Sequence, residues 1–204
     1  MKSVLISIRP EWVHKILDGK KTIEIRKNRP KIETPFKCYI YMTSGGWEWR
    51  DPFSTAIVPH AEGSEMYNGA QRVVAEFTCD RIDPIRVFDN GTIQNWNFYD
   101  LAKSCVPYDD VVAYIGNNRS GYGWHISDLM VYDKPKKLED FTPHCKYMID
   151  DMLSCDHRKI ACPHQHFDHN PWPDCSLNVV ICKRRMNRPP QSWCYVLDLE
   201  YRGM

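Results

Sequence analysis

The stretch Gly19-Lys20-Lys21-Thr22-Ile23-Glu24-Ile25-Arg26 brings a lysine, a glutamate and an arginine together directly after a short apolar strand pattern and a short helical pattern. Side chains alternate along a strand, so Thr22, Glu24 and Arg26 share one face and the two isoleucines take the other. We expect the face that carries the two isoleucines to pack into the hydrophobic core. The polar face predicts one wall of a cleft with Lys21 at its entrance. The alternative is a solvated edge strand beside a glycine turn.

Residues 7–26 resemble the opening of the ASCH domain, a branch of the PUA-like superfamily. The mark of that family is Gly-x-Lys-x-x-Glu-x-Arg, and Gly19, Lys21, Glu24 and Arg26 match its four positions. Three later pieces are similar to further family strands. They are residues 73–77 (Val-Val-Ala-Glu-Phe), 123–128 (Gly-Trp-His-Ile-Ser-Asp) and 188–196, the last of which resembles the closing strand of a bacterial and prophage subgroup. The resemblance covers residues 1–142 and 186–201.

The pattern of the chain predicts mostly strands with a few short helices. A length of 204 residues suits one domain with a substantial core. Apolar periodicity and turn residues predict strands at 3–8, 22–26, 37–43, 73–82, 122–132 and 193–200, helices at 10–18, 97–104 and 109–114, and a long loop at 44–70. We therefore expect an α+β fold, a small mixed β-barrel, and the resemblance implies a PUA-like one. It would form a single domain over 1–204, with an insertion at 143–187 before the last strand.

Charge and composition limit the classes of function. The net charge is +1, so the protein as a whole is not a polyanion binder, yet basic residues cluster at 20–31 and 183–188. Such clusters can hold phosphates, although many are only solvated surface. The chain has no apolar run long enough for a membrane span and no signal-peptide pattern at its start, so we expect a cytoplasmic protein.

The insertion at 143–187 is rich in cysteine and histidine and poor in hydrophobic periodicity. A segment that cannot bury a core needs another source of stability, and in the cytosol a metal is the usual one. The regular spacing of four cysteines predicts a structural zinc, although it lacks the compact Cys-x2-Cys knuckle. The alternatives are a surface loop, free thiols or disulfides. The expected ligands are Cys155, Cys162, Cys175 and Cys182.

Further candidates lie on other strands. Glu76 interrupts an apolar strand, where a carboxylate is costly unless paired, and Lys21 or Arg26 would be its partner. Trp124 could stack a nucleobase, but most tryptophans are core residues. His125 points to the other face from Trp124, and we expect it to be a structural histidine in the core.

The resemblance implies an RNA-binding or modified-nucleoside-binding protein, with a ligand such as RNA, a nucleoside or a nucleotide in a cleft at the motif. The expected ligand-binding residues are Ser7, Lys21, Glu24, Arg26, Glu76 and Trp124.

The alternative is a hydrolase. One small ASCH branch cleaves the amide of N4-acetylcytidine with a lysine, a threonine and a glutamate, and RNA is a second conceivable substrate. Lys21 and Glu76 match the lysine and glutamate positions, but Glu24 stands at the threonine position. In that case Lys21, Glu24 and Glu76 would be the catalytic set, with a carboxylate activating water and the ammonium stabilising the oxyanion.

Overall fold

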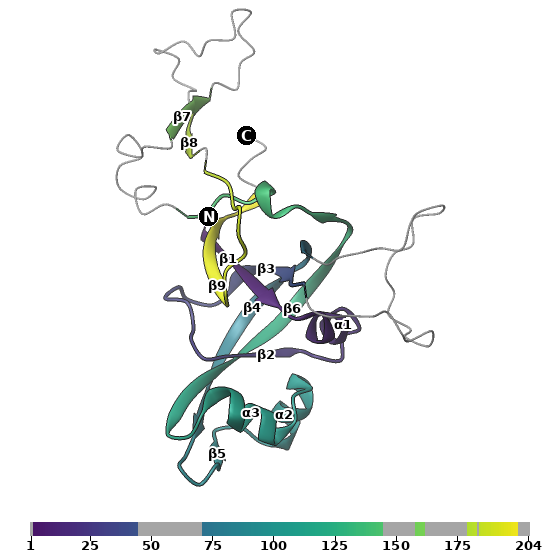
Figure 1. Cartoon of the computed structure of the whole chain (residues 1–204), viewed down its shortest axis with the longest axis vertical. Helices are drawn as coiled ribbons and strands as arrows, with labels where there is room; N and C mark the ends of the chain where they lie inside the picture. Colours follow the sequence, from purple (N-terminus) through teal and green to yellow (C-terminus); the bar gives the residue numbers. More distant parts are fainter. Residues whose placement is uncertain (1, 45–70, 145–157, 162–178, 183, 200–204) are drawn as a thin grey trace, which may run out of the picture.

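A computed structural model describes residues 2–44, 71–144, 158–161, 179–182 and 184–199. Its main sheet has the strand order β2-β6-β4-β3-β1-β9, and β5 pairs with β4 beside this path (Figure 1). β1 and β3 are parallel, and the other pairs are antiparallel. The strands are β1 (Lys2–Ile8), β2 (Ile23–Arg26), β3 (Phe36–Met42), β4 (Arg72–Val87), β5 (Ile93–Gln94), β6 (Arg119–Lys136) and β9 (Trp193–Leu197).

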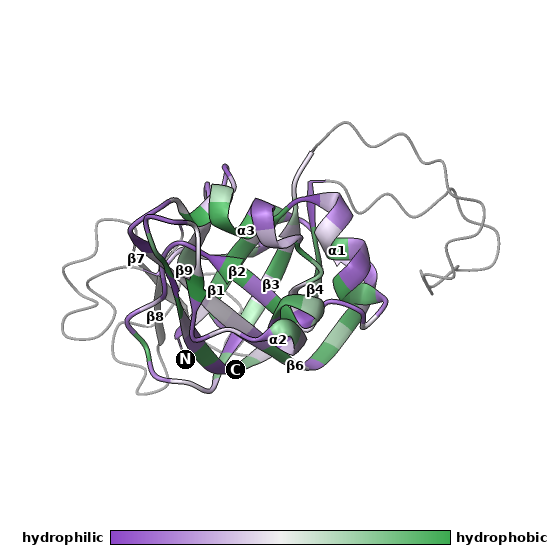
Figure 2. Ribbon diagram, turned by 90° about the horizontal axis from the view of Figure 1, so that it is seen from below, coloured by the Kyte–Doolittle hydropathy of each residue, from purple (hydrophilic) through white to green (hydrophobic). Residues whose placement is uncertain are grey.

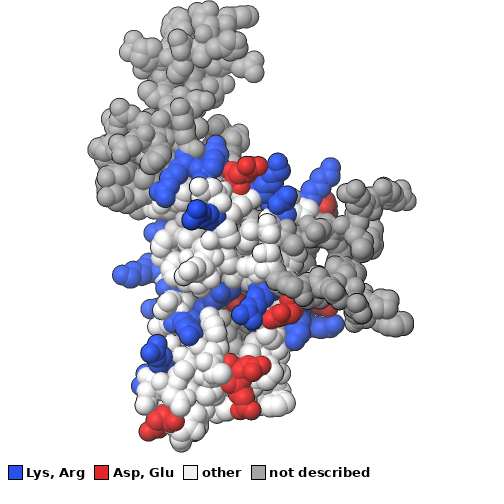
Figure 3. Space-filling view, in the orientation of Figure 1, with Lys and Arg blue, Asp and Glu red and all other residues white. Residues whose placement is uncertain are grey.

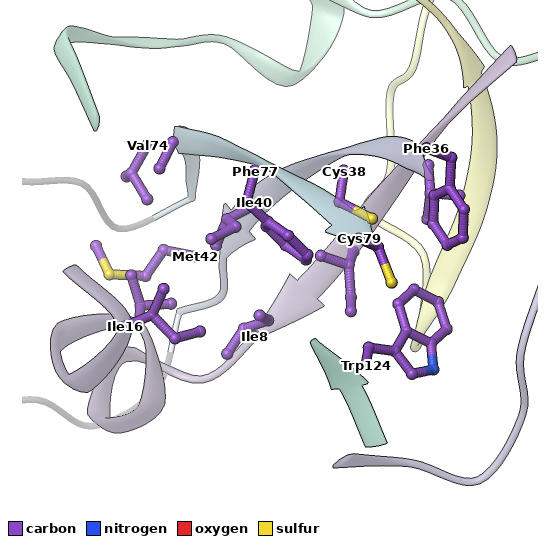
Figure 4. Packing of buried hydrophobic residues seen from close by; sticks show 14 residues of the cluster. Ile8, Ile16, Phe36, Cys38, Ile40, Met42, Val74, Phe77, Cys79 and Trp124 are labelled. Carbon is purple, nitrogen blue, oxygen red and sulfur yellow. The ribbon is translucent and has the colours of Figure 1, made fainter. Parts of the chain in front are cut away.

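The sheet is buried on both faces, and one face is concave. On that face Trp124 of β6 and Trp193 of β9 lie with ring centroids 6.0 Å apart, although their strands are near opposite ends of the strand order. The sheet therefore curls until its two ends approach each other. We call the apolar residues of this face the interior cluster; it includes Val4, Ile6, Ile8, Cys38, Ile40, Phe77, Cys79 and Trp124 (Figure 4).

Helix α1 (Pro10–Leu17) covers one end of the interior cluster with Val13 and Ile16. The opposite face of the sheet carries a second group, which we call the outer cluster; it includes Leu5, Tyr39, Tyr41, Val73, Tyr132, Phe141, Met186 and Val196. Because the side chains of β1 alternate, Val4 and Ile6 join the interior cluster while Leu5 joins the outer one. In Figure 2 the central strands are largely green, whereas the flanking helices carry both colours.

A third group of apolar residues packs α3 (Tyr108–Ile115) against β2 and the far part of the β4–β6 ribbon. A Cβ on Gly121 would lie 2.7 Å from Ile115 Cδ1, so glycine allows α3 to approach β6 closely. Helix α2 (Phe98–Ser104) precedes α3 and begins with a capping box. The Asn97 side chain accepts hydrogen bonds from backbone N–H groups of the first turn, and the Asp100 side chain accepts one from the Asn97 backbone N–H.

The predicted α+β class and small mixed barrel are confirmed; β4 and β6 are longer than expected, whereas β2 and β9 are shorter. The strand that was expected to end at residue 132 continues as β6 to Lys136 and includes Pro135. The reason is a register shift, because Val73 pairs with Lys136 and Ala75 with Val131, so Pro135 lies where the ladder is irregular and needs no N–H donor.

The short β5 and the 3₁₀ turn Leu138–Asp140 were not predicted. Within the insertion at 143–187, the structure describes a hairpin of β7 (Arg158–Ala161) and β8 (Val179–Cys182), where no regular structure was expected. The predicted loop at 44–70 lies almost wholly outside the described residues. None of the described helices is long and apolar enough to cross a membrane.

Candidate ligand site at the Lys21–Glu24–Arg26 network

The turn after α1 delivers Lys21 into the protein interior. Gly19 has a φ of +69°, and the backbone N–H groups of Lys20 and Lys21 both donate to the Lys15 carbonyl, which reverses the chain. The Lys21 side chain is 1% exposed. Its ammonium donates to the carbonyl oxygens of Ile23 at 2.9 Å and Ser104 at 2.6 Å, and it lies 3.2 Å from Glu24 Oε2. All three of its donors are therefore used inside the protein.

Glu24 and Arg26 complete the network. Arg26 Nη2 lies 3.0 Å from Glu24 Oε1, so each carboxylate oxygen of Glu24 has its own cation. The same Nη2 donates to the Ser7 carbonyl oxygen at 2.6 Å, and Nη1 donates to Ser192 Oγ at 3.4 Å. Three buried charges are tolerated because they neutralise one another and use backbone acceptors. The alternative interpretation of β2 as a solvated edge strand is excluded, since both of its charged residues, Glu24 and Arg26, are less than a tenth exposed.

Two buried donors at this network lack a partner. Among the described residues, neither Arg26 Nε nor Trp124 Nε1 has a hydrogen-bond partner, and both atoms are shielded from solvent. Glu24 pairs with Trp124 across β2 and β6, and Arg26 is the next residue of β2 on the same face. An unpaired buried donor costs about 1–3 kcal/mol, so the site offers an acceptor-bearing group two N–H donors.

The prediction that Glu76 shares a cleft with Glu24 is wrong. Glu76 pairs in register with Tyr39, a residue of the outer cluster, whereas Glu24 shares its face with Trp124 of the interior cluster. The partner of Glu76 is neither Lys21 nor Arg26; Glu76 accepts from Tyr132 Oη at 2.5 Å and lies 3.3 Å from Lys37 Nζ. The catalytic set of Lys21, Glu24 and Glu76 is therefore not assembled.

A second polar group on the outer face was missed by sequence reasoning. Lys37 Nζ lies 3.6 Å from Asp198 Oδ1 as well as beside Glu76, and Tyr39 Oη donates to Asp198 Oδ1 at 2.8 Å. Burial and the neighbouring carboxylates raise the pKa of Tyr39 and of Tyr132 well above the ordinary value. The alternation of Lys37 and Tyr39 on a strand signalled a polar stripe, but no local pattern could name Asp198, which is far away in sequence.

His125 was expected in the core and Trp124 on the face that meets the ligand, but the structure places Trp124 in the core. Trp124 is completely buried and packs with its ring centroid 6.0 Å from that of Phe36 (Figure 4), so it presents no free face for stacking. His125 faces the other side of the sheet, where Nε2 lies 2.7 Å from Asp83 Oδ2 and 3.1 Å from Arg81 Nη2. The expectation of a core histidine is therefore wrong, although its polar partners make it a satisfied one.

Ser7 belongs to the network through its main chain and its side chain. Its hydroxyl donates to the Pro190 carbonyl at 2.7 Å, its N–H donates to the Ser192 carbonyl, and its own carbonyl accepts from Arg26. The segment before β9 is thus held against the motif. Of the residues predicted to bind a ligand, the structure brings together Ser7, Lys21, Glu24, Arg26 and Trp124, and it separates Glu76 from them. That these residues bind a ligand stays a prediction.

The predicted zinc ligands cannot be compared with side-chain geometry. Cys155, Cys162 and Cys175 lie outside the described residues, and Cys182 is described only as the last residue of strand β8. Within the described part of the chain, no group of three or more His, Cys, Asp or Glu side chains is arranged to hold a metal. The zinc site stays a prediction.

The ASCH domain family model matches residues 6–42, which contain the whole motif together with the end of β1, α1, β2 and β3. This part of the chain is similar to the ASCH domain family. A search of curated proteins gives no significant match.

Solved structures to which this chain has some similarity include ASCH from Zymomonas mobilis, with 16% identity and a TM-score of 0.47, covering 98% of this chain and 91% of that one. A tyrosine-to-phenylalanine mutant of the Zymomonas mobilis protein has 15% identity and a TM-score of 0.48, covering 99% and 95%.

Proposed function

We propose that this protein binds RNA or a modified nucleoside, with a base or phosphate oxygen seated at the Lys21–Glu24–Arg26 network. The observation that carries the proposal is the pair of unpartnered buried donors, Arg26 Nε and Trp124 Nε1. Nucleobases present carbonyl oxygens and ring nitrogens on their edges, and each of these accepts a hydrogen bond. A ligand that presents two such acceptors would pair both donors.

Glu24 adds the opposite polarity to the same site. Its two oxygens already accept from Lys21 and Arg26, yet a carboxylate has about four lone-pair sites and can take a further donor. An exocyclic amino group is such a donor. The site thus suits a base edge that carries acceptors beside an amino group. Access requires movement of the covering side chains, because both unpaired donors are shielded from solvent.

The hydrolase alternative loses the carboxylate that the resemblance implied. Glu76 lies on the outer face with Lys37 and Tyr132, so only Lys21 and Glu24 of the proposed catalytic set remain together. Lys21 is held by three internal acceptors, which leaves it poorly placed to follow a developing oxyanion. We therefore place binding first and treat turnover as an outcome of the test.

The test compares two tryptophan variants. Trp124→Phe removes the unpaired Nε1–H, and Trp193→Phe removes the same ring volume from the neighbouring tryptophan, whose indole nitrogen is not among the unpaired buried atoms. Binding of cytidine, N4-acetylcytidine and a short single-stranded RNA is measured by calorimetry. We expect Trp124→Phe to weaken binding about tenfold, the equivalent of one lost hydrogen bond to a buried donor, and Trp193→Phe to change it little.

Equal losses in the two variants would show that packing, rather than the donor, matters. Saturable binding of none of these probes would overturn the proposal, and the unpaired donors would then be served by buried water. Release of acetate from N4-acetylcytidine that vanishes in Lys21→Ala would place the hydrolase first.

A further inference from the structure

The loop that joins β2 to β3, residues 27–35, carries a basic residue at every second position of its first half. Lys27, Arg29 and Lys31 alternate with Asn28 and a proline. All three basic residues are exposed, whereas Ile32 turns inward and packs against the interior cluster. The loop is therefore anchored from within and presents its charges to solvent.

Each of the three basic positions lies beside a tyrosine from a different element. Lys27 Nζ is 5.1 Å from the ring centre of Tyr114 on α3, and Arg29 Cζ is 5.8 Å from that of Tyr122 on β6. The backbone N–H of Lys31 donates to Tyr195 Oη on β9 at 2.6 Å.

A further cation reaches the last of these rings, because Lys2 Nζ lies 3.8 Å from the ring centre of Tyr195. Distances below about 6 Å from a ring face are those of cation–π contacts.

These three tyrosines follow the open side of the barrel. β2 and β9 are the two ends of the sheet path, and the loop runs from the first of them to a tyrosine on the second. We call Lys27, Arg29, Lys31 and the three tyrosines the seam track. It begins next to Arg26 of the ligand network, since Arg26 pairs with Tyr122 across β2 and β6.

The charge along the seam track is almost entirely positive. Arg119 at the start of β6 adds a further exposed cation nearby, since a Cβ added to Gly116 at the end of α3 would lie 3.5 Å from Arg119 Cδ. Of the acids closest in sequence, Glu33 lies beyond the basic positions of the loop and Asp110 one helical turn before Tyr114, while Glu24 and Asp198 are buried. In Figure 3, blue side chains gather on the left flank of the lower half, over the loop after β2 and the neighbouring part of β6.

We propose that the seam track binds single-stranded RNA that extends from the ligand network, an inference that rests on the proposed function. Aromatic rings interleaved with cations form the general platform for single strands, in which bases stack on rings and phosphates meet the cations. A duplex keeps its bases stacked on one another and cannot use the rings. The exposed ring of Tyr114, 41% exposed, and the planar guanidinium of Arg29 are the stacking surfaces, and Lys27 and Lys31 take phosphates.

The first experiment measures salt dependence. A fluorescein-labelled single-stranded RNA of about 12 nucleotides is titrated at several salt concentrations between about 50 and 200 mM. Lys27→Gln and Lys31→Gln should each lower the slope of log K against log salt by about 0.7, the value for one phosphate contact on a single strand.

Lys136→Gln is the matched control. It removes a cation 4.4 Å from the ring centre of Tyr132, the same kind of pair at the opposite end of β6, and it should leave the slope unchanged. Equal slopes in wild type and in both seam-track variants would overturn the proposal.

The second experiment tests stacking. Tyr114→Leu keeps an apolar side chain but removes the ring, and it should weaken single-strand binding about fivefold or more, whereas Tyr114→Phe should bind like wild type. More than a third of Tyr114 is exposed, so neither variant should endanger the fold. A duplex of the same sequence bound as tightly as the single strand would overturn the stacking role.

The seam track and the ligand network fail in different ways. Loss of nucleoside binding in Trp124→Phe with normal nucleoside binding in Lys27→Gln and Tyr114→Leu supports two adjoining sites. RNA that binds through the seam track as tightly in Trp124→Phe as in wild type, while nucleosides do not bind, would overturn the seating of a base at the ligand network and leave the seam track standing. If nucleosides bind but RNA affinity does not depend on the seam-track residues, the seam-track proposal is overturned and the proposed function stands.

Discussion

Arg26 on edge strand β2 donates to the backbone carbonyl oxygen of Ser7 on β1, with Nη2 2.6 Å from the oxygen. β1 is the fifth strand of the sheet path and β2 is the first, so this contact joins strands that do not pair. The arginine of the motif thus closes the barrel, and its other hydrogen bond reaches Ser192 before β9. One side chain therefore links the motif, the first strand and the closing segment of the fold.

Arg26→Ala should destabilise the fold strongly. The substitution leaves Glu24 buried with a single cation and opens the contact to Ser7, and breaking a buried ion pair costs about 3–5 kcal/mol. Chemical denaturation measures the free energy of unfolding. Arg29→Ala is the control, because an exposed arginine three residues further along, in the loop after β2, should change that free energy by less than about 0.5 kcal/mol. Similar small losses in both variants would contradict the closing role of Arg26.

Glu24 and Glu76 should contribute independently to stability. They lie on opposite faces of the sheet and share no partner, so the effects of Glu24→Gln and Glu76→Gln should add to within about 0.5 kcal/mol. Lys37→Met and Glu76→Gln should instead couple by about 0.5–3 kcal/mol, because the two side chains are in contact. Double-mutant cycles from denaturation curves give both values. A clear coupling between the two glutamates would contradict the separation of the faces.

Three cysteines should resist alkylation in the folded protein. Burial raises the pKa of Cys38 well above its ordinary value, that of Cys79 to about 12 and that of Cys194 to about 11. Only the thiolate reacts, so these residues stay unmodified by iodoacetamide at about pH 8 and become modified once the protein is unfolded in urea. Peptide mass spectrometry assigns each site. Rapid labelling of Cys79 in the native protein would show that the interior opens readily.

Stability should fall as the pH falls below the ordinary histidine range. Burial lowers the pKa of His14 and of His144 from 6.5. The unfolded chain therefore binds more protons than the folded one between the lowered pKa and about 6.5, and stability rises with pH across that window. His14→Gln should flatten this part of the curve of unfolding free energy against pH. If the curve of the variant is as steep as that of the wild type, His14 does not contribute to the pH dependence of stability.

Zinc at the insertion remains open to a direct measurement. Protein purified without immobilised metal should carry about one zinc per chain by elemental analysis, and Cys162→Ser or Cys175→Ser should remove it. The physical reason is that binding of the metal by the thiolates supplies the segment with folding free energy, which it otherwise lacks. Cys105→Ser, which alters a thiol outside the insertion, is the control. Metal-free protein with fully reduced cysteines would contradict the site.

The sequence by itself determined the local elements and the chemistry of the motif. Alternation of apolar residues located β1, β3 and β9 to within a few residues, and Pro10 with Gly19 bounded the first helix. The order of glycine, lysine, glutamate and arginine at 19–26 identified the charged stretch of the motif, but the expected position of Lys21 at the entrance of a cleft is wrong, because its side chain is 1% exposed in the interior. These properties depend on neighbours in the chain, which periodicity and turn chemistry report directly.

Tertiary structure decided which charges meet. Glu76 and Glu24 are both carboxylates on strands of the main sheet, yet the register of β3 with β4 sends Glu76 to Tyr132 and Lys37 on the outer face. The curl of the sheet brings Arg26 to Ser7 and sets Trp124 on Trp193, neither of which any local pattern encodes. A shift of one residue in register exchanges the two faces of a strand, so sequence can name the polar residues of a barrel without fixing their partners.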